Sequence, residues 1–251
     1  MSIIINADDF GINSEVNQAI CECFSKKLID RTTLMVNMPF ADEAARLAKE
    51  QQFFDHVGLH LNLTSGKPLT EKIAQNQLFC DHAGYFHAGF YKSTMKRLYM
   101  SPADVQMIRD ELEAQIKKYL EYGFTCRHLD SHHHVHTNLP ILKALIPLIK
   151  QNQIRTVRLG RNLFHKERFF NVIYKKFYNG KLQRMQVCAS RYFGSYADYI
   201  RYMSDPSIDQ AAFEVKYQTE IMVHPMYDKN GILTDADLTM DQNWISVFET
   251  R

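Results

Sequence analysis

Short apolar runs alternate along this chain with longer segments in which apolar residues recur every three or four positions. A short run rich in β-branched residues is typical of a buried strand, and the wider spacing is typical of an amphipathic helix. Between residues 14 and 27, for example, Val16, Ala19, Ile20 and Cys23 fall on one helical face. The strands predicted in this way are 3–6, 32–36, 57–63, 127–130, 156–159, 185–189 and 219–223. The predicted helices are 14–27, 41–51, 102–120, 138–152 and 162–179.

Strands that alternate with helices of this length predict a parallel sheet with its helices outside. About seven such units fit a closed or slightly broken barrel better than an open two-layer sheet. Residues 65–101 lack a clean period, and we expect them to form an inserted loop or lid. No linker or repeat divides the chain, so one domain over residues 1–251 is predicted.

The composition narrows the setting in which this chain works. Hydrophobic residues make up 45% and charged residues 23%, as in soluble globular proteins. The net charge of +2 gives no reason to expect nucleic acid, and no run of 18 apolar residues predicts a membrane span. The chain start lacks a signal peptide, and its five cysteines contain no CxxC pair. We therefore expect a cytoplasmic protein without a nucleic-acid or membrane partner.

The polar residues of interest follow the predicted strands. In a parallel barrel the chemistry lies at the C-terminal ends of the strands. Asp8 and Asp9 come after the first strand, His60 lies near the end of the third, and His224 ends the last. The segment 128–136, which follows the fourth strand, contains Asp130 and histidines at 132, 133, 134 and 136. Carboxylates and imidazoles from distant parts of the chain are thus predicted to meet at one rim.

Each of these features also has a structural interpretation. Asp8 and Asp9 could cap a turn that enters a helix. A single histidine on an apolar strand, such as His60, is more often a hydrogen-bonded core residue. The histidine run differs, because every buried ring nitrogen needs a partner, and this favours a metal or catalytic role.

The residue types permit one kind of chemistry in particular. One carboxylate and two imidazoles leave open positions on a divalent ion for water and substrate. Of two adjacent aspartates, one can bind the ion while the other takes a proton from the water. A protonated histidine can then donate to a leaving amine. Together these groups predict metal-assisted hydrolysis of an amide or ester.

Five motifs carry a resemblance to a known family. They are Asn-Ala-Asp-Asp-Phe-Gly at 6–11, Leu-Met-Val-Asn-Met-Pro at 34–39, Gly-Leu-His-Leu-Asn-Leu-Thr at 58–64, His-Leu-Asp-Ser-His-His-His-Val-His at 128–136 and His-Pro at 224–225. At these residues the sequence resembles the YdjC family of carbohydrate deacetylases, such as the chitooligosaccharide deacetylases. The resemblance implies a distorted, incomplete TIM-like barrel, a homodimer, and removal of acetyl groups from N-acetylated sugars. It also implies one divalent ion, usually Mg²⁺, although a nitrogen-rich site suits Zn²⁺ or Co²⁺ equally.

Matching the motifs residue by residue assigns roles within the site. The resemblance implies Asp9, His60 and His132 as metal ligands, Asp8 as general base and His224 as general acid. Asp130 is the candidate partner that would orient His224 and keep it charged. The family usually continues the last motif as His-Pro-Gly, whereas this chain has methionine at that position.

Two other functions fit the same residue types. One is a metal phosphoesterase on a similar barrel, and the other is a non-catalytic sugar-binding protein that kept a metal site. For the deacetylase we expect a small, uncharged or weakly charged N-acetyl sugar. Residues 65–101 and 161–210 carry no resemblance, and we expect them to shape substrate choice. The aromatic residues of the first segment either stack on the sugar or pack the segment onto the body; they are Phe79, Tyr85, Phe86, Phe90 and Tyr91.

Overall fold

Seven parallel strands form the central sheet of the computed structural model, which describes residues 3–163, 169–188, 190–207 and 218–237. The strands stand in the order β5-β4-β3-β2-β1-β7-β6. Their bounds are Ile3–Phe10 for β1, Arg31–Leu34 for β2, Val57–Leu61 for β3, His128–Ser131 for β4, Thr156–Val157 for β5, Tyr192–Ser195 for β6 and Thr219–Val223 for β7.

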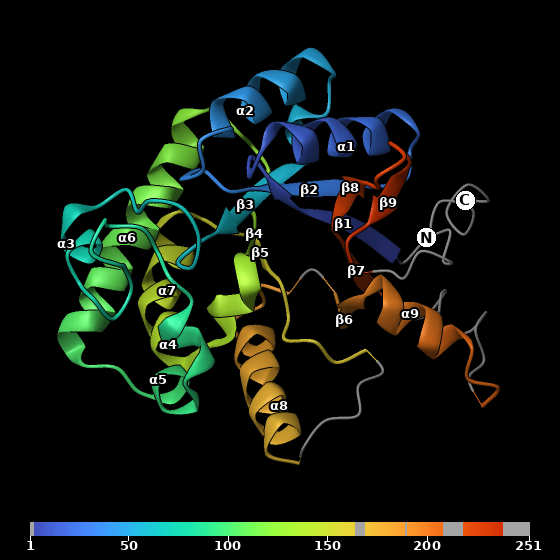
Figure 1. Cartoon of the computed structure of the whole chain (residues 1–251). Helices are drawn as coiled ribbons and strands as arrows, with labels where there is room; N and C mark the ends of the chain where they lie inside the picture. The colour runs from blue at the N-terminus through green and yellow to red at the C-terminus, as the bar shows by residue number, and fades with distance from the viewer. Residues whose placement is uncertain (1–2, 164–168, 189, 208–217, 238–251) are drawn as a thin grey trace.

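The strand order is that of a barrel left open at one seam. β1 pairs with β2 on one side and with β7 on the other, so the sheet follows the cyclic order of a barrel (Figure 1). Its two edges are β5 and β6. Within the described residues, the β5 edge makes one isolated bridge toward the seam, from Val157 to Cys188. The predicted α/β class and the incomplete TIM-like barrel of about seven strands are confirmed.

Helices connect the strands and cover the outside of the sheet (Figure 1). Their bounds are Ser14–Ser25 for α1, Ala41–Glu50 for α2, Glu71–Ala74 for α3, Gly89–Lys92 for α4, Thr94–Leu98 for α5, Pro102–Glu121 for α6, Leu139–Gln151 for α7, Phe169–Arg184 for α8 and Tyr196–Met203 for α9. Two 3₁₀ segments, η1 at Phe54–His56 and η2 at His132–Thr137, precede β3 and follow β4. A hairpin of β8 (Pro225–Tyr227) and β9 (Leu233–Asp235) packs on α1.

Side chains at the helix starts explain where the main helices begin. The Asn13 side chain accepts a hydrogen bond from the backbone of Val16 at 2.8 Å, which satisfies a free N–H group of α1. Ser101 and Asp104 form a reciprocal capping box at the start of α6, and Pro102 occupies its first turn. Two of the predicted helix starts therefore have a local cause.

The prediction for residues 185–189 was wrong as a strand. Helix α8 continues to Arg184, because Tyr178 and Leu182 keep its inner face buried. In the described part of this segment only Cys188 forms a bridge, and residue 189 lies outside the described residues. The sixth strand comes later, at Tyr192–Ser195, where Phe193 is fully buried. The predicted helix at 162–179 correspondingly begins at 169, and residues 164–168 are not described.

Residues 65–101 form a folded layer rather than an extended loop. They contain α3, α4 and α5, and the rings of Phe79, Phe86 and Phe90 are buried. These three rings therefore pack the segment onto the body, while Tyr85 is exposed. Buried Glu111 of α6 anchors the start of the segment, since its carboxylate accepts hydrogen bonds from Leu69 and Thr70 at 2.8–3.0 Å.

None of the helices in the described ranges combines the length and the apolar character needed to cross a bilayer. The longest, α6, has 20 residues, and it carries buried polar side chains on its inner face, including Glu111 and Gln115. Gln115 exchanges two hydrogen bonds with the backbone of Asn62, at 2.9 and 2.7 Å. The helix thus holds the end of β3 in place next to the rim where the predicted site residues lie.

Candidate metal centre and substrate cavity

Three predicted ligands converge at the C-terminal rim of the sheet. Asp9 lies next to the last residue of β1, His60 lies in β3, and His132 follows β4 directly. Each offers a ligand atom within 4.8 Å of the other two. The carboxylate Oδ1 of Asp9 lies 2.7 Å from Nδ1 of His132 and 3.2 Å from Nε2 of His60. The sequence-based grouping of these residues thus agrees with their positions in space.

Unusual backbone conformations aim the side chains of this rim. Asp9 has a φ of 69°, in the left-handed region, and lies where the register of β1 against β2 shifts. His133 and His134 have φ values of 53° and 54°. A non-glycine residue in this region costs about 1–3 kcal/mol, and such strain gathers at functional sites. The shift separates the two aspartates, because Asp9 contacts histidines while Asp8 contacts a buried arginine.

His60 is oriented as a metal ligand should be. Its Nδ1 lies 2.7 Å from Oδ1 of Asp130, to which it donates, and this leaves Nε2 facing Asp9. A carboxylate behind the ring fixes the tautomer and makes the other nitrogen a better ligand. Burial lowers the pKa of His60, but Asp130 and Asp8 raise it to about 10. The same negative surroundings that favour a proton here favour a divalent cation.

Asp130 was expected to orient His224, and that expectation was wrong. Asp130 contacts His60 and also Arg158, whose Nη2 lies 2.7 Å from it. The partner of His224 is Asp237, whose carboxylate lies 3.1 Å from Nδ1. The strand order explains the difference, because β3, β2 and β1 separate β4 from β7.

Arg158 is a central residue that the sequence reasoning missed. Its guanidinium is fully buried just after β5 and binds Asp8 through two nitrogens, at 2.6 and 2.7 Å. It also contacts Asp130 and Glu220, each at 2.7 Å. Burial raises the pKa of Asp8, but Arg158 outweighs this and holds the pKa well below its usual range. The sequence did contain a signal for this pair. Arg158 and Glu220 each interrupt a predicted strand that is otherwise mostly apolar, at 156–159 and 219–223.

The formal charges of the buried cluster leave room for a divalent cation. The carboxylates are Asp8, Asp9, Asp130 and Glu220, and the guanidinium groups are Arg31 and Arg158. Four negative and two positive charges leave a net charge of −2 when the His60 ring is neutral, as binding a metal through its Nε2 requires. Burial, with Arg31 and Arg158 nearby, keeps the pKa of His128 well below its usual value, so this ring adds no charge. The donor set and the charge both fit one divalent ion beside Asp9.

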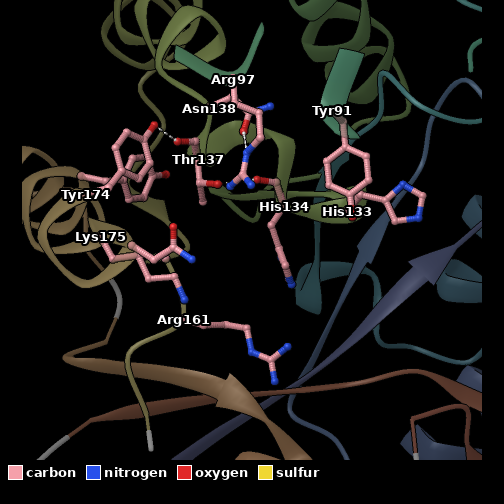
Figure 2. Close-up of a pocket in the computed structure, with 12 residues that line it drawn as sticks. Tyr91, Arg97, His133, His134, Thr137, Asn138, Arg161, Tyr174 and Lys175 are labelled. Atoms are coloured by element: carbon pink, nitrogen blue, oxygen red, sulfur yellow. Dashed lines mark hydrogen bonds between the residues drawn. The ribbon is translucent and has the colours of Figure 1, made fainter. Parts of the chain in front are cut away.

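A cavity of about 260 Å³ opens beside the histidine segment. Figure 2 shows its lining, with Tyr91 next to His133 and basic side chains around the space. The rings of Tyr91 and His133 stack with their centroids 5.2 Å apart. The side chains that matter here are Tyr91, Arg97, His134, Arg161, Tyr174 and Lys175. Within the described residues no acidic side chain lines this cavity, so it suits a ligand rich in hydrogen-bond acceptors.

Comparison with known sequences places this site in a family. A family profile described as "YdjC-like protein" matches residues 2–248. The chain belongs to the YdjC-like family. It is 31% identical to a carbohydrate deacetylase of Thermoanaerobacter pseudethanolicus, over 94% of this chain and 92% of the relative. A carbohydrate deacetylase of Brevibacillus brevis is also 31% identical, over 94% of this chain and 86% of the relative.

A solved structure has a similar fold. It is a putative cellobiose-phosphate cleavage protein of Enterococcus faecalis, with a TM-score of 0.67 and 25% sequence identity. The match covers 98% of this chain and 90% of the other. The open barrel is therefore found in a related protein, and its rim is the place to look for the activity of this YdjC-like chain.

Proposed function

We propose that this chain is a metal-dependent carbohydrate deacetylase that hydrolyses the acetyl group of a small N-acetylated sugar. The family and the relatives named carbohydrate deacetylase support this activity. The observation that carries it is the meeting of Asp9, His60 and His132 beside an ionised Asp8 at one rim. A cavity with aromatic and hydrogen-bonding side chains opens next to the same histidine segment.

Asp9, His60 and His132 would hold one divalent ion. The family resemblance implies Mg²⁺, and two imidazole donors suit Zn²⁺ or Co²⁺ as well. A bound ion would polarise the acetyl carbonyl. It would also lower the pKa of a water molecule, so that a carboxylate as weakly basic as Asp8 could accept its proton. Asp130 supports the ligand set by fixing the His60 ring.

Asp8 takes the proton of the attacking water in this proposal. Arg158 and Asn6 hold the carboxylate, and Asn6 donates to Oδ1 at 2.8 Å. Oδ2 accepts from Arg158 alone among the described residues, so one of its lone pairs can face the water. Because Arg158 keeps Asp8 ionised, the base is in its active form at neutral pH.

His224 donates a proton to the amine as the C–N bond breaks. Burial lowers the pKa of His224, but its hydrogen bond with Asp237 and the charges of Asp8 and Asp9 raise it to about 9. The ring is therefore protonated at neutral pH, with Nδ1 held by Asp237 and Nε2 without a hydrogen-bond partner among the described residues. The two acid–base groups lie at the ends of adjacent strands, β1 and β7.

A two-metal phosphoesterase is disfavoured by the position of Arg158. Such enzymes place two ions about 3.5–4 Å apart. The second acidic group of this rim, formed by Asp8, Asp130 and Glu220, already contacts the Arg158 guanidinium. A second cation at this group would have to replace the buried arginine. We also propose that the enzyme is one domain with an insertion at 65–101, works in the cytoplasm and forms a homodimer, as the resemblance implies.

Acetate release tests the proposal. The purified protein is given a panel of N-acetylated sugars and a panel of phosphomonoesters, with and without a chelator. We expect acetate from at least one sugar, loss of activity with chelator and recovery with a divalent metal. Phosphate release without acetate release would contradict the proposal in favour of the phosphoesterase. Sugar binding without either product would favour the non-catalytic alternative.

A further inference from the structure

Two elements that enclose the cavity carry exposed apolar side chains. On α8, Phe170, Ile173 and Phe177 follow one another at helical spacing and form a stripe. Residues 171, 174 and 178, which line the cavity, lie one position further round the same helix. On α5 and just after it, Met95, Leu98 and Tyr99 flank Arg97, another lining residue. The exposed fractions of these six apolar side chains range from 49% to 81%.

The same two elements concentrate positive charge. Residues 89–99 and 169–184 contain seven basic residues and no acidic one. The whole chain has a net charge of only +2, so the remainder carries −5. The basic residues are Lys92, Lys96, Arg97, Lys175, Lys176, Lys181 and Arg184. We call the exposed face formed by residues 89–99 and 169–184 the rim surface. In Figure 1, α4, α5 and α8 lie on the side of the molecule away from α1 and α2.

The combination of exposed aromatic and aliphatic residues with basic side chains is typical of helices that lie in a membrane interface. Anionic lipids attract the basic groups, while the apolar residues enter the boundary between headgroups and acyl chains. A symmetric contact between two copies would bring two surfaces of charge +7 face to face, which disfavours a second copy here. Charge complementarity thus favours an anionic bilayer as the occupant.

We propose that the rim surface docks on an anionic lipid bilayer and presents the cavity to an N-acetylated sugar carried by a membrane lipid. The second part rests on the proposed function. Lipid carriers hold sugars through phosphate, and Arg97, Arg161 and Lys175 bring positive charge to the wall of the cavity (Figure 2). This proposal replaces the expectation of no membrane partner. The described helices still lack the length and apolar character to cross a bilayer, and docking requires only that the rim surface lie on the membrane.

Vesicle sedimentation tests the docking. We expect the protein to bind vesicles of phosphatidylcholine with one-third phosphatidylglycerol, to bind pure phosphatidylcholine weakly, and to dissociate as salt is raised. The double substitution Lys176→Gln and Lys181→Gln should reduce binding about 25-fold, since each basic group contributes about fivefold. Lys143→Gln, an exposed lysine on α7, is the matched control and should leave binding unchanged.

The apolar stripe is tested in the same way. Phe170→Ser with Phe177→Ser should abolish most vesicle binding, whereas Ile232→Ser, which removes from the β8–β9 hairpin an apolar residue about as exposed as Phe177, should not. Equal loss in the Ile232→Ser control, or no preference for anionic vesicles in the unmodified protein, would overturn the docking. Conversion of a dimer to a monomer by the Phe170 and Phe177 substitutions would overturn it in favour of a subunit interface.

A rate comparison separates this proposal from the proposed function. Acetate release is measured on a polyprenyl-phosphate-linked N-acetylglucosamine in vesicles and on soluble N-acetylglucosamine 1-phosphate. We expect the vesicle-bound substrate to give a kcat/KM at least tenfold higher, and the Lys176→Gln, Lys181→Gln variant to lose that advantage while keeping the soluble rate. Equal rates for the two substrates would overturn the lipid-linked substrate alone. The absence of acetate from both would contradict the proposed function, and vesicle binding would still decide the docking.

Discussion

Arg158 shows how much of this site depends on a single side chain. Its guanidinium contacts Asp8, Asp130 and Glu220, and its Cζ atom lies 4.8 Å from the centre of the Phe193 ring. Removing one member of a buried ion pair typically costs about 3–5 kcal/mol, because an uncompensated charge is left behind. Arg158 therefore stabilises the rim and, through its two bonds to Asp8, positions the proposed base.

At the residue scale, the substitution Asp8→Asn should distinguish the role of a general base from that of a metal ligand. We expect kcat to fall by about 10²–10⁴-fold while the bound metal is retained, because Asn cannot accept the proton. Asp9→Asn is the matched comparison and should lose the metal. Metal content by elemental analysis and turnover by acetate release measure the two effects. If Asp8→Asn loses the metal and Asp9→Asn keeps it, the two aspartates have exchanged roles.

His224 gives the site a pH dependence whose sign follows from its pKa. The folded-state pKa of about 9 lies above the ordinary histidine value of 6.5, so the linked stability is present below about pH 6.5 and is lost as pH rises through 9. The acid form disappears over the same upper range, so kcat should fall above about pH 9. His224→Gln should lower kcat by about 10²–10⁴-fold, with little change in KM.

The measurement is a profile of kcat against pH for the unmodified protein and for two variants. His82→Gln, an exposed histidine in the insertion, serves as the control and should keep the alkaline fall. Nearly full kcat in His224→Gln would mean that His224 has a structural role, held by Asp235 and Asp237 at the hairpin.

At the scale of elements, the insertion at 65–101 and helix α6 act as one unit. Glu111 accepts four hydrogen bonds from Leu69 and Thr70, and Gln115 holds Asn62 at the end of β3. Burial is the main cause that raises the pKa of Glu111, and these hydrogen bonds partly oppose it. The insertion carries Tyr91 and Arg97 to the cavity, so its anchoring bears on substrate binding.

Glu111→Ala should therefore loosen the insertion without reaching the metal ligands. Leaving the backbone N–H groups of Leu69 and Thr70 unpaired should lower the free energy of unfolding by about 1–3 kcal/mol. For a chain of this size that corresponds to a fall in Tm of about 2–12 °C. KM for the sugar should rise while metal binding is unchanged. Glu111→Gln keeps an acceptor, so its Tm should lie between those of the unmodified protein and Glu111→Ala. An unchanged Tm in Glu111→Ala would contradict the anchoring.

At the scale of the whole molecule, the fold places an excess of negative charge at the metal rim and an excess of positive charge on the rim surface. With its histidine rings neutral, the cluster at the rim has a formal charge of −2, and a divalent ion would neutralise it. The rim surface on α5 and α8 is strongly positive, while the remainder of the chain is negative. The small net charge of the sequence thus hides an uneven distribution, which became visible only when the elements were placed.

A chelator should destabilise the protein as a whole. A ligand present at 100 times its Kd stabilises the folded state by about 2.7 kcal/mol, so its removal should lower the Tm by about 5–10 °C. Adding back a divalent metal should restore it, and thermal unfolding with Mg²⁺, Zn²⁺ and Co²⁺ would rank the ions. The Asp9→Asn variant is the control, whose Tm should not respond to the chelator. An equal response in the unmodified protein and the control would contradict this metal site.

The sequence by itself determined the features that depend on local order. Alternating strand and helix patterns predicted the α/β barrel, and the capping residues at positions 13 and 101 have a cause within a few residues. The meeting of carboxylates and imidazoles at one rim could also be predicted, because parallel strands share one rim. The choice of Asp9, His60 and His132 among them came from the resemblance to the family. Their chemical roles stay predictions that the proposed substitutions test.

Only the tertiary structure decided which charges meet. Asp8 and Arg158 lie 150 residues apart in the chain, and nothing local relates them. The same holds for the pairing of Asp130 with His60, the choice of Asp237 for His224 and the seam between β5 and β6. A buried charge must find an opposite charge somewhere, but the strand order of the folded sheet decides which one lies within reach.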